Sequence, residues 1–473
     1  MGAPAQSETY DLAVIGAGPG GYVAALRAAQ LGMKVAVVEK AELGGVCLNR
    51  GCIPTKAMLE AAAFVHEMKR AADDGLIAES GAVTVNYSAL LKRRDKAVQR
   101  LTRGVAGLLK HGDVDVHHGA ATFVGPSTLK VQPTEGNGGE YPLEAVSVIV
   151  ATGSLPARLP LPGADAQRVI DSDGALALKE VPERLIVVGG GAVGCEWSTI
   201  FSRLGTKVTL IEMLPTLLPR TEPELGRLLE KTLTAEGVDV RTGMTLDGFE
   251  EREAAIAAVP AGEDETLEAD YVLSAAGRRP NTEGLGLEQA GVKTNQGGWI
   301  EVDPHCRTNV ASIYAIGDVT GGALLAHVAS RQGVIVAETL GGLAPEPVRP
   351  ERIPAVTFTD PEIATVGLTE EEAKASGLEI EIGRFPFSAS GKAVATGHDT
   401  GLVKMVADRQ FGRLLGVHIA GPHAGELLAE AVLALELEAT LDELSSVIRS
   451  HPTLSEAVGE AAMAAQGHAL HSV

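Results

Sequence analysis

Aromatic residues make up only 3% of this chain of 473 residues, and cysteine occurs only four times. The shortage of aromatic side chains means that aliphatic residues and alanine must fill the core. Four cysteines in a chain of this length indicate catalysis or redox chemistry and not a disulfide scaffold. Long apolar runs are also missing, because glycines or charges interrupt each of them before the roughly 20 residues that a membrane span needs.

Positive charge is in deficit. Forty Lys and Arg residues stand against 61 Asp and Glu residues, which gives a net charge of −21. This balance excludes extended contact with the phosphate backbone of nucleic acid. Residues 1–7 lack the basic and apolar regions of a secretory signal. We therefore expect a cytoplasmic protein that has neither nucleic acid nor a membrane as its partner.

Two of the cysteines, Cys47 and Cys52, stand five positions apart in a glycine-rich stretch that ends in Lys56. A zinc site does not fit this spacing, and the sequence has no second pair. The other two, Cys195 and Cys306, stand alone, as small buried hydrophobic residues do. The pair makes sense as a disulfide that opens and closes during turnover, but taken without context a structural pair fits equally well. The neighbouring sequence has to decide between them.

A complete dinucleotide-binding signature precedes this pair. The apolar strand Asp11–Ile15 runs into a Gly-x-Gly-x-x-Gly motif and then into the alanine-rich helix Tyr22–Leu31. Gly16 permits the tight turn, Gly18 lets a pyrophosphate approach the backbone, and Gly21 lets helix and strand pack closely. This pattern predicts a first nucleotide site.

The signature occurs a second time. In the first copy the next strand, Lys34–Val38, ends in Glu39, whose carboxylate can bind ribose hydroxyls and would repel a 2′-phosphate. In both copies the last glycine and the acidic residue are 18 positions apart. Two copies at one spacing predict two dinucleotide sites. The second copy consists of strand Arg184–Val188, the glycines Gly189, Gly191 and Gly194, a helix through Arg203, strand Lys207–Ile211 and Glu212.

Two nucleotides and a disulfide predict an electron relay, because a flavin can exchange electrons with both nicotinamide and sulfur. The first signature lies next to the cysteine pair, so we assign FAD to Gly16–Glu39 and NAD to Gly189–Glu212. Glu212 has no arginine directly beside it, which favours NAD over NADP. Arg220 leaves NADP open, because it could reach a 2′-phosphate if its loop folds back.

The rest of the chain adds further elements. Tyr87–Lys110 is expected to be a charged helix, and Asp318 follows an apolar strand as a candidate buried ligand of sugar hydroxyls. Near the C-terminus, Glu456 could orient the ring of His451 and raise its basicity. Further strands and a helix are expected in three stretches, namely Asp115–Val131 with Ser147–Ala151, the antiparallel pair Leu402–Ala407 and Arg413–Ile419, and the helix Gly425–Leu437.

Several motifs in one order make the chain resemble the pyridine nucleotide-disulfide oxidoreductases over nearly its whole length, and most closely those that oxidise dihydrolipoyl groups. The motifs are Gly44–Lys56, the second signature with Cys195 and Glu196, Ala315–Val319, Thr357–Gly367 and His451–Glu456. The resemblance implies an α/β fold with two Rossmann-like FAD- and NAD-binding domains and a C-terminal α+β dimerisation domain. The expected domains are residues 1–153 for FAD, 154–276 for NAD, 277–349 as a central domain that completes the FAD site, and 350–473 as the interface.

The same resemblance implies residue roles. Cys52 would be the thiolate against the flavin, Cys47 the thiol that exchanges with substrate sulfur, and His451, oriented by Glu456, the acid/base that reaches the disulfide from the other subunit of a homodimer. Lys56 and Glu196 would pair near the flavin. The expected FAD contacts are Gly16, Gly18, Gly21, Glu39, Lys40, Lys56, Thr152, Gly153, Asp318, Ala326 and His327. The expected NAD contacts are Gly189, Gly191, Val193, Gly194, Glu196, Glu212 and Gly277.

The implied reaction is the oxidation of protein-bound dihydrolipoyl groups to lipoyl groups with reduction of NAD+. The implied partners are the lipoyl domains and the acyltransferase core of a 2-oxo acid dehydrogenase complex. Two alternatives stay open. One is an NADPH-dependent reductase of a low-molecular-weight disulfide, which Glu212 argues against and Arg220 leaves possible. The other is a mainly structural assembly subunit that binds a basic partner through its acidic surface.

Overall fold

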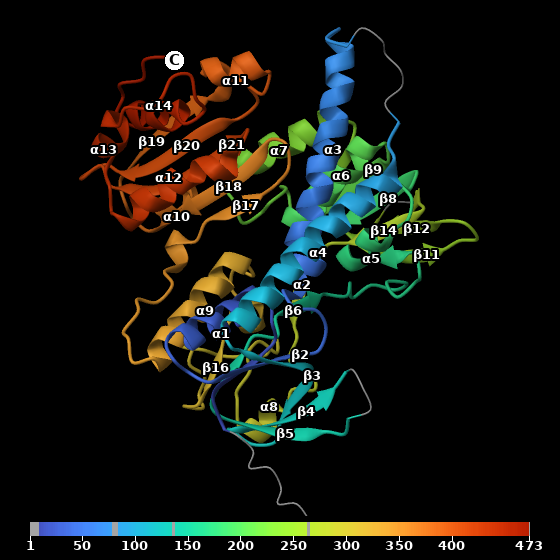
Figure 1. Ribbon diagram of the computed structural model, residues 1–473. Helices are drawn as coiled ribbons and strands as arrows, with labels where there is room; N and C mark the ends of the chain where they lie inside the picture. Colours follow the sequence, from blue (N-terminus) through green and yellow to red (C-terminus); the bar gives the residue numbers. More distant parts are fainter. Residues whose placement is uncertain (1–8, 78–83, 135–137, 263–264, 473) are drawn as a thin grey trace, which may run out of the picture. The chain divides into compact units, whose positions relative to one another are not determined.

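The computed structural model describes residues 9–77, 84–134, 138–262 and 265–472. The chain divides into two units, each built from segments far apart in the sequence (Figure 1). Unit 1 consists of residues 1–57, 89–157 and 277–348, and unit 2 consists of residues 58–88, 158–276 and 349–473. Residues 1–7, on which the expectation of a cytoplasmic protein partly rests, lie outside the described residues.

Unit 1 is built on a sheet with the strand order β1-β2-β3-β4-β5-β16, in which β1 also pairs with β5. Strand β1 pairs in parallel with β2 and β5, and β16 pairs in parallel with β5. The parallel strands are almost entirely buried, as expected for a sheet with both faces covered. The strands are β1 Tyr10–Ile15, β2 Val35–Glu39, β3 Asp115–Phe123, β4 Thr128–Pro133, β5 Tyr141–Val150 and β16 Ile313–Ala315.

Helices α1 and α9 pack closely along each other beside this sheet (Figure 1). Small residues permit the contact, since a Cβ atom on Gly333 would come within 2.6 Å of the carbonyl oxygen of Gly20. The helices that begin in or belong to this unit are α1 Pro19–Gln30, α2 Gly45–Asn49, α3 Cys52–Asp73, α4 Tyr87–His111, α8 Leu287–Ala290, η1 Gly317–Thr320 and α9 Ala326–Leu340. A short antiparallel pair, β6 Ser154–Pro156 and β15 Arg278–Pro280, completes the unit.

Unit 2 contains a second parallel sheet, with the order β10-β9-β8-β14-β7. An antiparallel sheet, β11-β12-β13, accompanies it. The strands are β7 Val169–Ile170, β8 Arg184–Val188, β9 Lys207–Glu212, β10 Asp239–Thr242, β11 Leu246–Glu251, β12 Ile256–Pro260, β13 Leu267–Ala269 and β14 Tyr271–Ser274. The helices are α5 Ser172–Ala177, α6 Ala192–Leu204 and α7 Pro223–Ala235.

The C-terminal part of unit 2 is an antiparallel sheet with the order β17-β18-β21-β20-β19, covered by α12 and α14. Its strands are β17 Ala355–Thr357, β18 Glu362–Gly367, β19 Ile380–Pro386, β20 Leu402–Asp408 and β21 Leu414–Gly421. Its helices are η2 Pro350–Arg352, α10 Glu370–Ala375, η3 Phe387–Ala389, α11 Gly391–Thr396, α12 Ala424–Glu436, α13 Leu441–Ser446 and α14 Glu456–Ala465.

The expected α/β fold class is confirmed, with a mixed, largely parallel sheet in unit 1, a parallel sheet in unit 2 and a C-terminal α+β part. Strand Arg184–Val188 has the predicted bounds, and the predicted antiparallel pair is β20 with β21. The first helix was expected from Tyr22 but begins at Pro19, because proline suits a first helical position that needs no N–H. In the part of the chain that the structure describes, no helix combines the length and apolar character that a membrane crossing requires.

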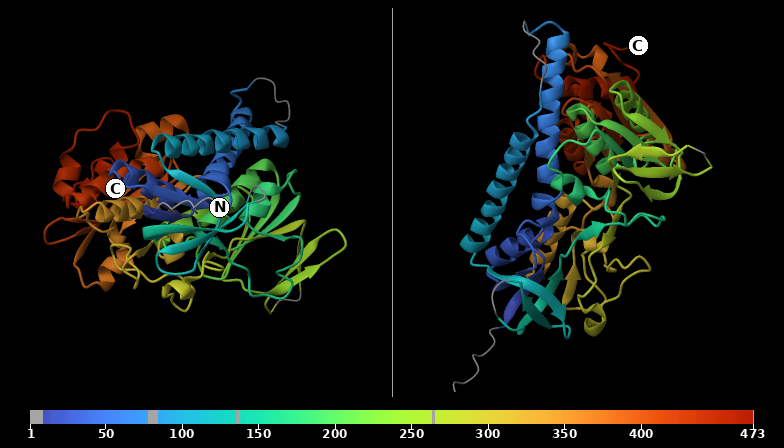
Figure 2. Two further views of the ribbon diagram at one scale, coloured as in Figure 1. Left: turned by 60° about the horizontal axis from the view of Figure 1, so that its bottom comes forward. Right: turned by 90° about the vertical axis from the view of Figure 1, so that its right-hand side faces the viewer.

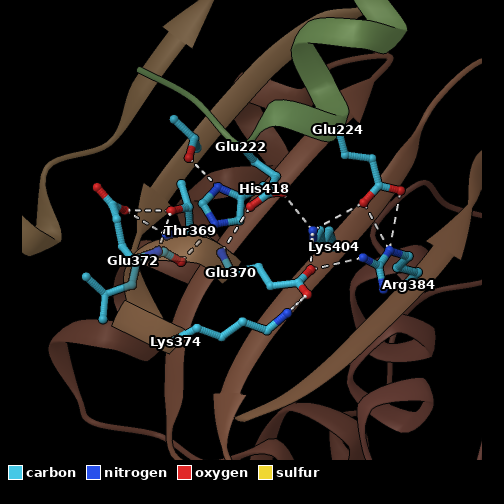
Figure 3. Close-up of polar contacts among 11 residues, drawn as sticks. Glu222, Glu224, Thr369, Glu370, Glu372, Lys374, Arg384, Lys404 and His418 are labelled. Carbon is cyan, nitrogen blue, oxygen red and sulfur yellow. Dashed lines mark hydrogen bonds and ion pairs between the residues drawn. The ribbon is translucent and has the colours of Figure 1, made fainter. Parts of the chain in front are cut away.

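A buried ion cluster connects the two parts of unit 2. The side chain of Lys404 in β20 is only 2% exposed, and its Nζ lies 2.7 Å from Glu222 Oε1 at the start of α7 and 2.8 Å from Glu370 Oε2 in α10. Glu224 and Arg384 extend the cluster, with a distance of 3.0 Å between Arg384 Nε and Glu224 Oε2 (Figure 3). The nucleotide-binding sheet and the C-terminal sheet are therefore joined by charges that have lost most of their water.

Candidate functional site

The three glycines of the first motif differ in the space around their Cα atoms. Gly16 has a φ of +102°, and a Cβ atom there would lie 2.5 Å from the carbonyl oxygen of Ala151. A Cβ atom on Gly21 would lie 1.9 Å from the carbonyl oxygen of Gly16. Gly18 differs, because its nearest neighbour, the Cα atom of Gly45, would be 4.0 Å away. The middle glycine thus leaves open space where a pyrophosphate could approach the backbone and the N-terminus of α1.

The second motif repeats this geometry. Gly189 has a φ of +113°, and a Cβ atom there would lie 2.6 Å from the carbonyl oxygen of Ala275. A Cβ atom on Gly194 would lie 1.8 Å from the carbonyl oxygen of Gly189, whereas Gly191 has nothing within 4 Å. Both loops can therefore hold a dinucleotide in the same way.

The acidic residues after the second strands also correspond to each other. Glu39 accepts hydrogen bonds from the backbone N–H groups of Ala17 at 2.7 Å and Ala41 at 2.8 Å. Glu212 accepts from Gly190 at 2.6 Å and from Leu214 at 2.8 Å. Each carboxylate therefore fixes its own glycine loop, a role that the sequence analysis missed. Because a carboxylate has about four acceptor positions, each can still accept from ribose hydroxyls.

The loop after Glu212 folds back on the second glycine motif. The backbone N–H of Leu218 donates to the carbonyl oxygen of Gly190 at 2.9 Å. Arg220 follows two residues later with an exposed side chain. The backbone therefore folds back as Arg220 would require to reach a 2′-phosphate. The preference for NAD over NADP stays a prediction.

The cysteine pair lies against the first glycine loop. Cys47 is in the short helix α2, and Cys52 is the first residue of α3. The segment is held to the loop by a hydrogen bond of 2.8 Å from the N–H of Gly44 to the carbonyl oxygen of Ala17, and a Cβ atom on Gly45 would lie 2.7 Å from the Cα atom of Gly18. The proximity of nucleotide loop and cysteines that the sequence suggested is thus present within unit 1.

The side chains of the two cysteines interact directly. The side-chain hydrogen bond with Cys52, together with burial, raises the pKa of Cys47, whereas the charge of Lys56 acts in the opposite direction. Cys52 starts a long helix, and a helix N-terminus stabilises a thiolate. The geometry therefore favours a protonated thiol at Cys47 and places the Cys52 side chain at a helix N-terminus.

The remaining predicted FAD residues surround the end of β5. The hydroxyl oxygen of Thr152 is buried and has no hydrogen-bond partner among the described residues, so a ligand group could satisfy it. Gly153 follows with a φ of +72°. Asp318, expected at a strand end and buried, lies instead in η1 with 25% of its side chain exposed, because the chain turns after β16.

Two neighbours of Asp318 were missed by the sequence analysis. The hydroxyl of Ser154 donates to Asp318 Oδ2 at 2.6 Å, and Arg278 Nε donates to the Ser154 hydroxyl at 2.6 Å. Asn281 donates from its side chain to the carbonyl oxygen of Thr152 at 3.0 Å. Arg278 and Asn281 belong to the Gly-Arg-Arg-Pro-Asn segment of residues 277–281, which the fold pairs with β6.

The other predicted cofactor residues have different surroundings. Ala326 and His327 are the first two residues of α9. Glu196 is buried in α6 and accepts from the N–H of Phe358 at 3.0 Å. Its expected pairing with Lys56 stays a prediction, because the two residues belong to different units. Of the remaining predicted cofactor residues, Val193 and Lys40 are exposed, and Gly277 has a φ of +116°.

His451 and Glu456 are brought together by the turn before α14. His451 Nδ1 lies 2.8 Å from Glu456 Oε1, and the second oxygen of Glu456 accepts from the N–H of Thr453 at 2.8 Å. The hydrogen bond from Thr453, and then that from His451, lower the pKa of Glu456. The side chain of His451 is 79% exposed. Its Nε2 is therefore available for proton transfer to a group outside this part of the chain.

Cys195 and Cys306 are both buried, as expected for isolated cysteines. Burial raises the pKa of Cys195, and it raises the pKa of Cys306 to about 12. Thiols of this kind are poor nucleophiles. Cys47 and Cys52, which interact with each other, therefore stay the candidates for redox chemistry.

Comparisons with known proteins agree with this geometry. Residues 10–333 match the family model described as pyridine nucleotide-disulphide oxidoreductase, and residues 353–462 match the dimerisation domain of that family. Dihydrolipoyl dehydrogenases from Thermus scotoductus and Bacillus subtilis are 48% and 44% identical over 98% of this chain and 99% of their own length. The HOCl-induced flavoprotein disulfide reductase RclA from Escherichia coli superimposes with a TM-score of 0.87 at 28% identity, over 96% of this chain and 99% of that chain.

Proposed function

This chain belongs to the pyridine nucleotide-disulphide oxidoreductase family, and from that membership we propose that it oxidises protein-bound dihydrolipoyl groups to lipoyl groups with NAD+ as acceptor. The resemblance found in the sequence is thereby confirmed at the level of the family. The observation that carries the proposal is the interacting thiol pair Cys47 and Cys52, hydrogen-bonded through its segment to the first glycine loop. Relatives named dihydrolipoyl dehydrogenase support this choice of substrate.

The proposed cofactors are FAD at the first glycine motif and NAD+ at the second. The open space at Gly18 and Gly191 and the unsatisfied hydroxyl of Thr152 support this assignment. A bound flavin would supply two-electron transfer between a dithiol and a nicotinamide. Glu39 and Glu212 would each accept hydrogen bonds from a ribose while they hold their glycine loops.

The first half of the proposed reaction is thiol–disulfide exchange. His451 accepts the proton of one substrate thiol, and the resulting thiolate attacks the Cys47 sulfur of the oxidised pair. A bond forms between substrate sulfur and Cys47, the Cys47–Cys52 bond breaks, and Cys52 leaves as a thiolate. The helix N-terminus at Cys52 stabilises that charge.

The second half releases the product. The other substrate thiol attacks the mixed disulfide and its proton goes to the Cys47 sulfur, while His451 still holds the first proton. Substrate is released as a cyclic disulfide, and Cys47 leaves and takes up a proton, for which its raised pKa is suited. The substrate has then lost two electrons to the cysteine pair, and their transfer to NAD+ restores the Cys47–Cys52 disulfide.

We further propose a homodimer in which His451 of the partner subunit serves each cysteine pair. The match to a dimerisation domain and the exposed ring of His451 support this arrangement. Apolar side chains of the same C-terminal part are also exposed, with Ile448 at 97% and Leu437 at 71%. Exposed apolar patches of this kind mark protein–protein contacts.

The proposed partners are the lipoyl domains and the acyltransferase core of a 2-oxo acid dehydrogenase complex. The cytoplasmic location expected from the sequence stays a prediction.

An NADPH-dependent reductase of a small disulfide is the second candidate. It is favoured by the backbone hydrogen bond between Leu218 and Gly190, which turns the Arg220 loop toward the nucleotide motif. The negative charge of Glu212 opposes it.

The test is stopped-flow absorbance with purified flavin-loaded protein, mixed in parallel with dihydrolipoamide, glutathione and NADPH, and then with NAD+. We expect dihydrolipoamide to produce a long-wavelength thiolate–flavin band that NAD+ discharges. Reduction by NADPH alone, with reoxidation by another disulfide, would favour the reductase. Absence of any disulfide turnover would favour a structural assembly role.

A further inference from the structure

Helix α4 carries a charge opposite to that of the chain around it. Its sequence, Tyr87–His111, contains seven Lys and Arg residues and one acidic residue, in a chain whose net charge is −21. Arg94 binds the only acidic residue of the helix, Asp95, at 2.7 Å. Six cations of α4 are exposed, and among the described residues none of them has an ion-pair partner. They are Lys92, Arg93, Lys96, Arg100, Arg103 and Lys110.

The six cations lie on one face. Successive residues of an α-helix turn by about 100°, so the six positions fall within an arc of about 100° over about 27 Å of helix length. Like charges one turn apart repel each other and lower helix stability. We call this face the basic stripe, defined by the six cations named above. Figure 2 shows α4 along the outside of unit 1, with its outer face not covered by another described element of that unit.

The opposite face of α4 packs into the core next to the cysteine segment. Val105 and Leu109 are buried in a hydrophobic cluster that also contains Leu48, and Cys47 and Ile53 pack against the same cluster. The helix that presents the cations is therefore fixed to the core under the redox segment. A partner that binds this face would be held on the unit that carries Cys47.

We propose that the basic stripe of α4 is the docking surface for an acidic face of the protein domain that carries the dihydrolipoyl group. The inference rests on the proposed function, because it names the feature by which the protein-bound form of that substrate is recognised. Charge complementarity supports it, since steering between opposite charges raises the association rate of proteins. The strong negative charge of the rest of the chain opposes a large polyanion such as nucleic acid or an anionic membrane.

The test compares two forms of one substrate. The triple variant Lys92→Gln, Lys96→Gln and Arg103→Gln removes three of the six cations of the basic stripe. The matched control Lys207→Gln, Lys231→Gln and Lys293→Gln removes the same charge from exposed positions elsewhere. The kcat/KM of each flavin-loaded protein is measured with free dihydrolipoamide and with an acidic protein domain that bears a dihydrolipoyl group, at low and high salt.

We expect the stripe variant to lose about tenfold in kcat/KM toward the acidic domain at low salt, with the difference vanishing at high salt. Its activity toward free dihydrolipoamide should change by less than about twofold, and the control should match the parent protein with both substrates. Neutralising the carboxylates of the acidic domain should reduce the kcat/KM of the parent protein to that of the stripe variant.

Four outcomes would overturn the inference. Unchanged kinetics of the stripe variant toward the acidic domain, while free dihydrolipoamide is still oxidised, would remove the docking role and leave the proposed function intact. If the kinetics were unchanged but the variant no longer bound phosphatidylserine vesicles, the basic stripe would be assigned to a membrane. If the kinetics were unchanged but light scattering showed that the variant no longer dimerised, the stripe would be assigned to a second copy of the chain. A parent protein that oxidises neither substrate would overturn the proposed function and the inference with it.

Discussion

The imidazole Nδ1 of His451 lies 2.8 Å from Oε1 of Glu456. The lowered pKa of Glu456, caused first by the N–H of Thr453, keeps this carboxylate ionised at neutral pH. An ionised carboxylate fixes the ring and stabilises a proton on it, which are the requirements of a general base. The pair therefore has the geometry of a catalytic histidine with its orienting acid.

Replacing His451 tests this role. We expect His451→Gln to lower dihydrolipoamide turnover by about 100-fold or more, because general base catalysis contributes about 10² to 10⁴. Flavin content should stay unchanged. The matched control is His471→Gln, since His471 forms a similar exposed pair with Glu460 at 2.6 Å. Near-normal steady-state turnover of His451→Gln, or an equal loss in the control, would remove His451 from the mechanism.

The two cysteines should respond differently to substitution. In Cys47→Ser the dithiol substrate loses its point of attack, so oxidation should fall below detection, whereas Cys52 can still form a thiolate beside the flavin. In Cys52→Ser the long-wavelength thiolate band should be lost as well. Absorbance spectra and turnover with dihydrolipoamide separate the two results. Cys306→Ser, which changes an isolated buried thiol, should retain both the band and the activity. If Cys47→Ser still oxidised dihydrolipoamide, the assignment of Cys47 as the thiol that exchanges with substrate would be wrong.

The two glycine-loop carboxylates offer a cross-test of the cofactor assignment. Glu212 and Glu39 make equivalent hydrogen bonds to Gly190 and Ala17. We expect Glu212→Gln to raise the KM for NAD+ about tenfold and to relax the preference over NADP+, with normal flavin content. Glu39→Gln should instead lower flavin content and leave the KM for NAD+ of the loaded fraction unchanged. The reverse result, measured by flavin absorbance and steady-state kinetics, would exchange the two sites.

Much of the fold was accessible from the sequence because its signals are local. The two glycine motifs with their following strands depend on residues a few positions apart, and β8 was predicted with its observed bounds. The separation of 18 positions between Gly21 and Glu39 places the acid at the end of β2, beside the loop. Such features need no knowledge of the tertiary structure.

The contacts that were missed join residues far apart in the sequence. Ser154 meets Asp318 across 164 positions, so no spacing rule could have paired them. Lys404 is a sharper example, because it is a charged residue in β20, a strand that is buried almost throughout. A lysine there is acceptable only because Glu222 and Glu370 arrive from distant helices.

Removing Lys404 should destabilise unit 2 strongly. Lys404→Met keeps much of the side-chain volume but leaves the buried carboxylate of Glu222 without its counter-charge, which costs about 3–5 kcal/mol. Lys374→Met is the matched control, because Lys374 binds the same Glu370 at 2.5 Å with 61% of its side chain exposed. An exposed pair contributes about 0–1 kcal/mol. Urea unfolding at neutral pH measures both, and similar losses in the two variants would contradict the importance of the buried cluster.

The same cluster should make unit 2 sensitive to acid. The hydrogen bonds from Lys374 and Lys404 lower the pKa of Glu370 from 4.5 to about 2. A carboxyl group whose pKa is lower in the folded state stabilises the fold above its unfolded pKa, and this contribution is lost as the pH falls from 4.5 toward 2. The stability difference between the parent protein and Glu370→Gln should therefore be largest above pH 4.5 and shrink toward pH 2.

Urea unfolding as a function of pH measures this difference. Glu371→Gln is the control, because it removes the same charge from the same helix at an exposed position without a contact to Lys404. The control should follow the parent protein across the pH range. A Glu370→Gln variant whose stability deficit stayed constant from pH 7 to pH 3 would show that the ionised carboxylate of Glu370 does not stabilise the cluster, since a contribution from ionisation must disappear with the charge.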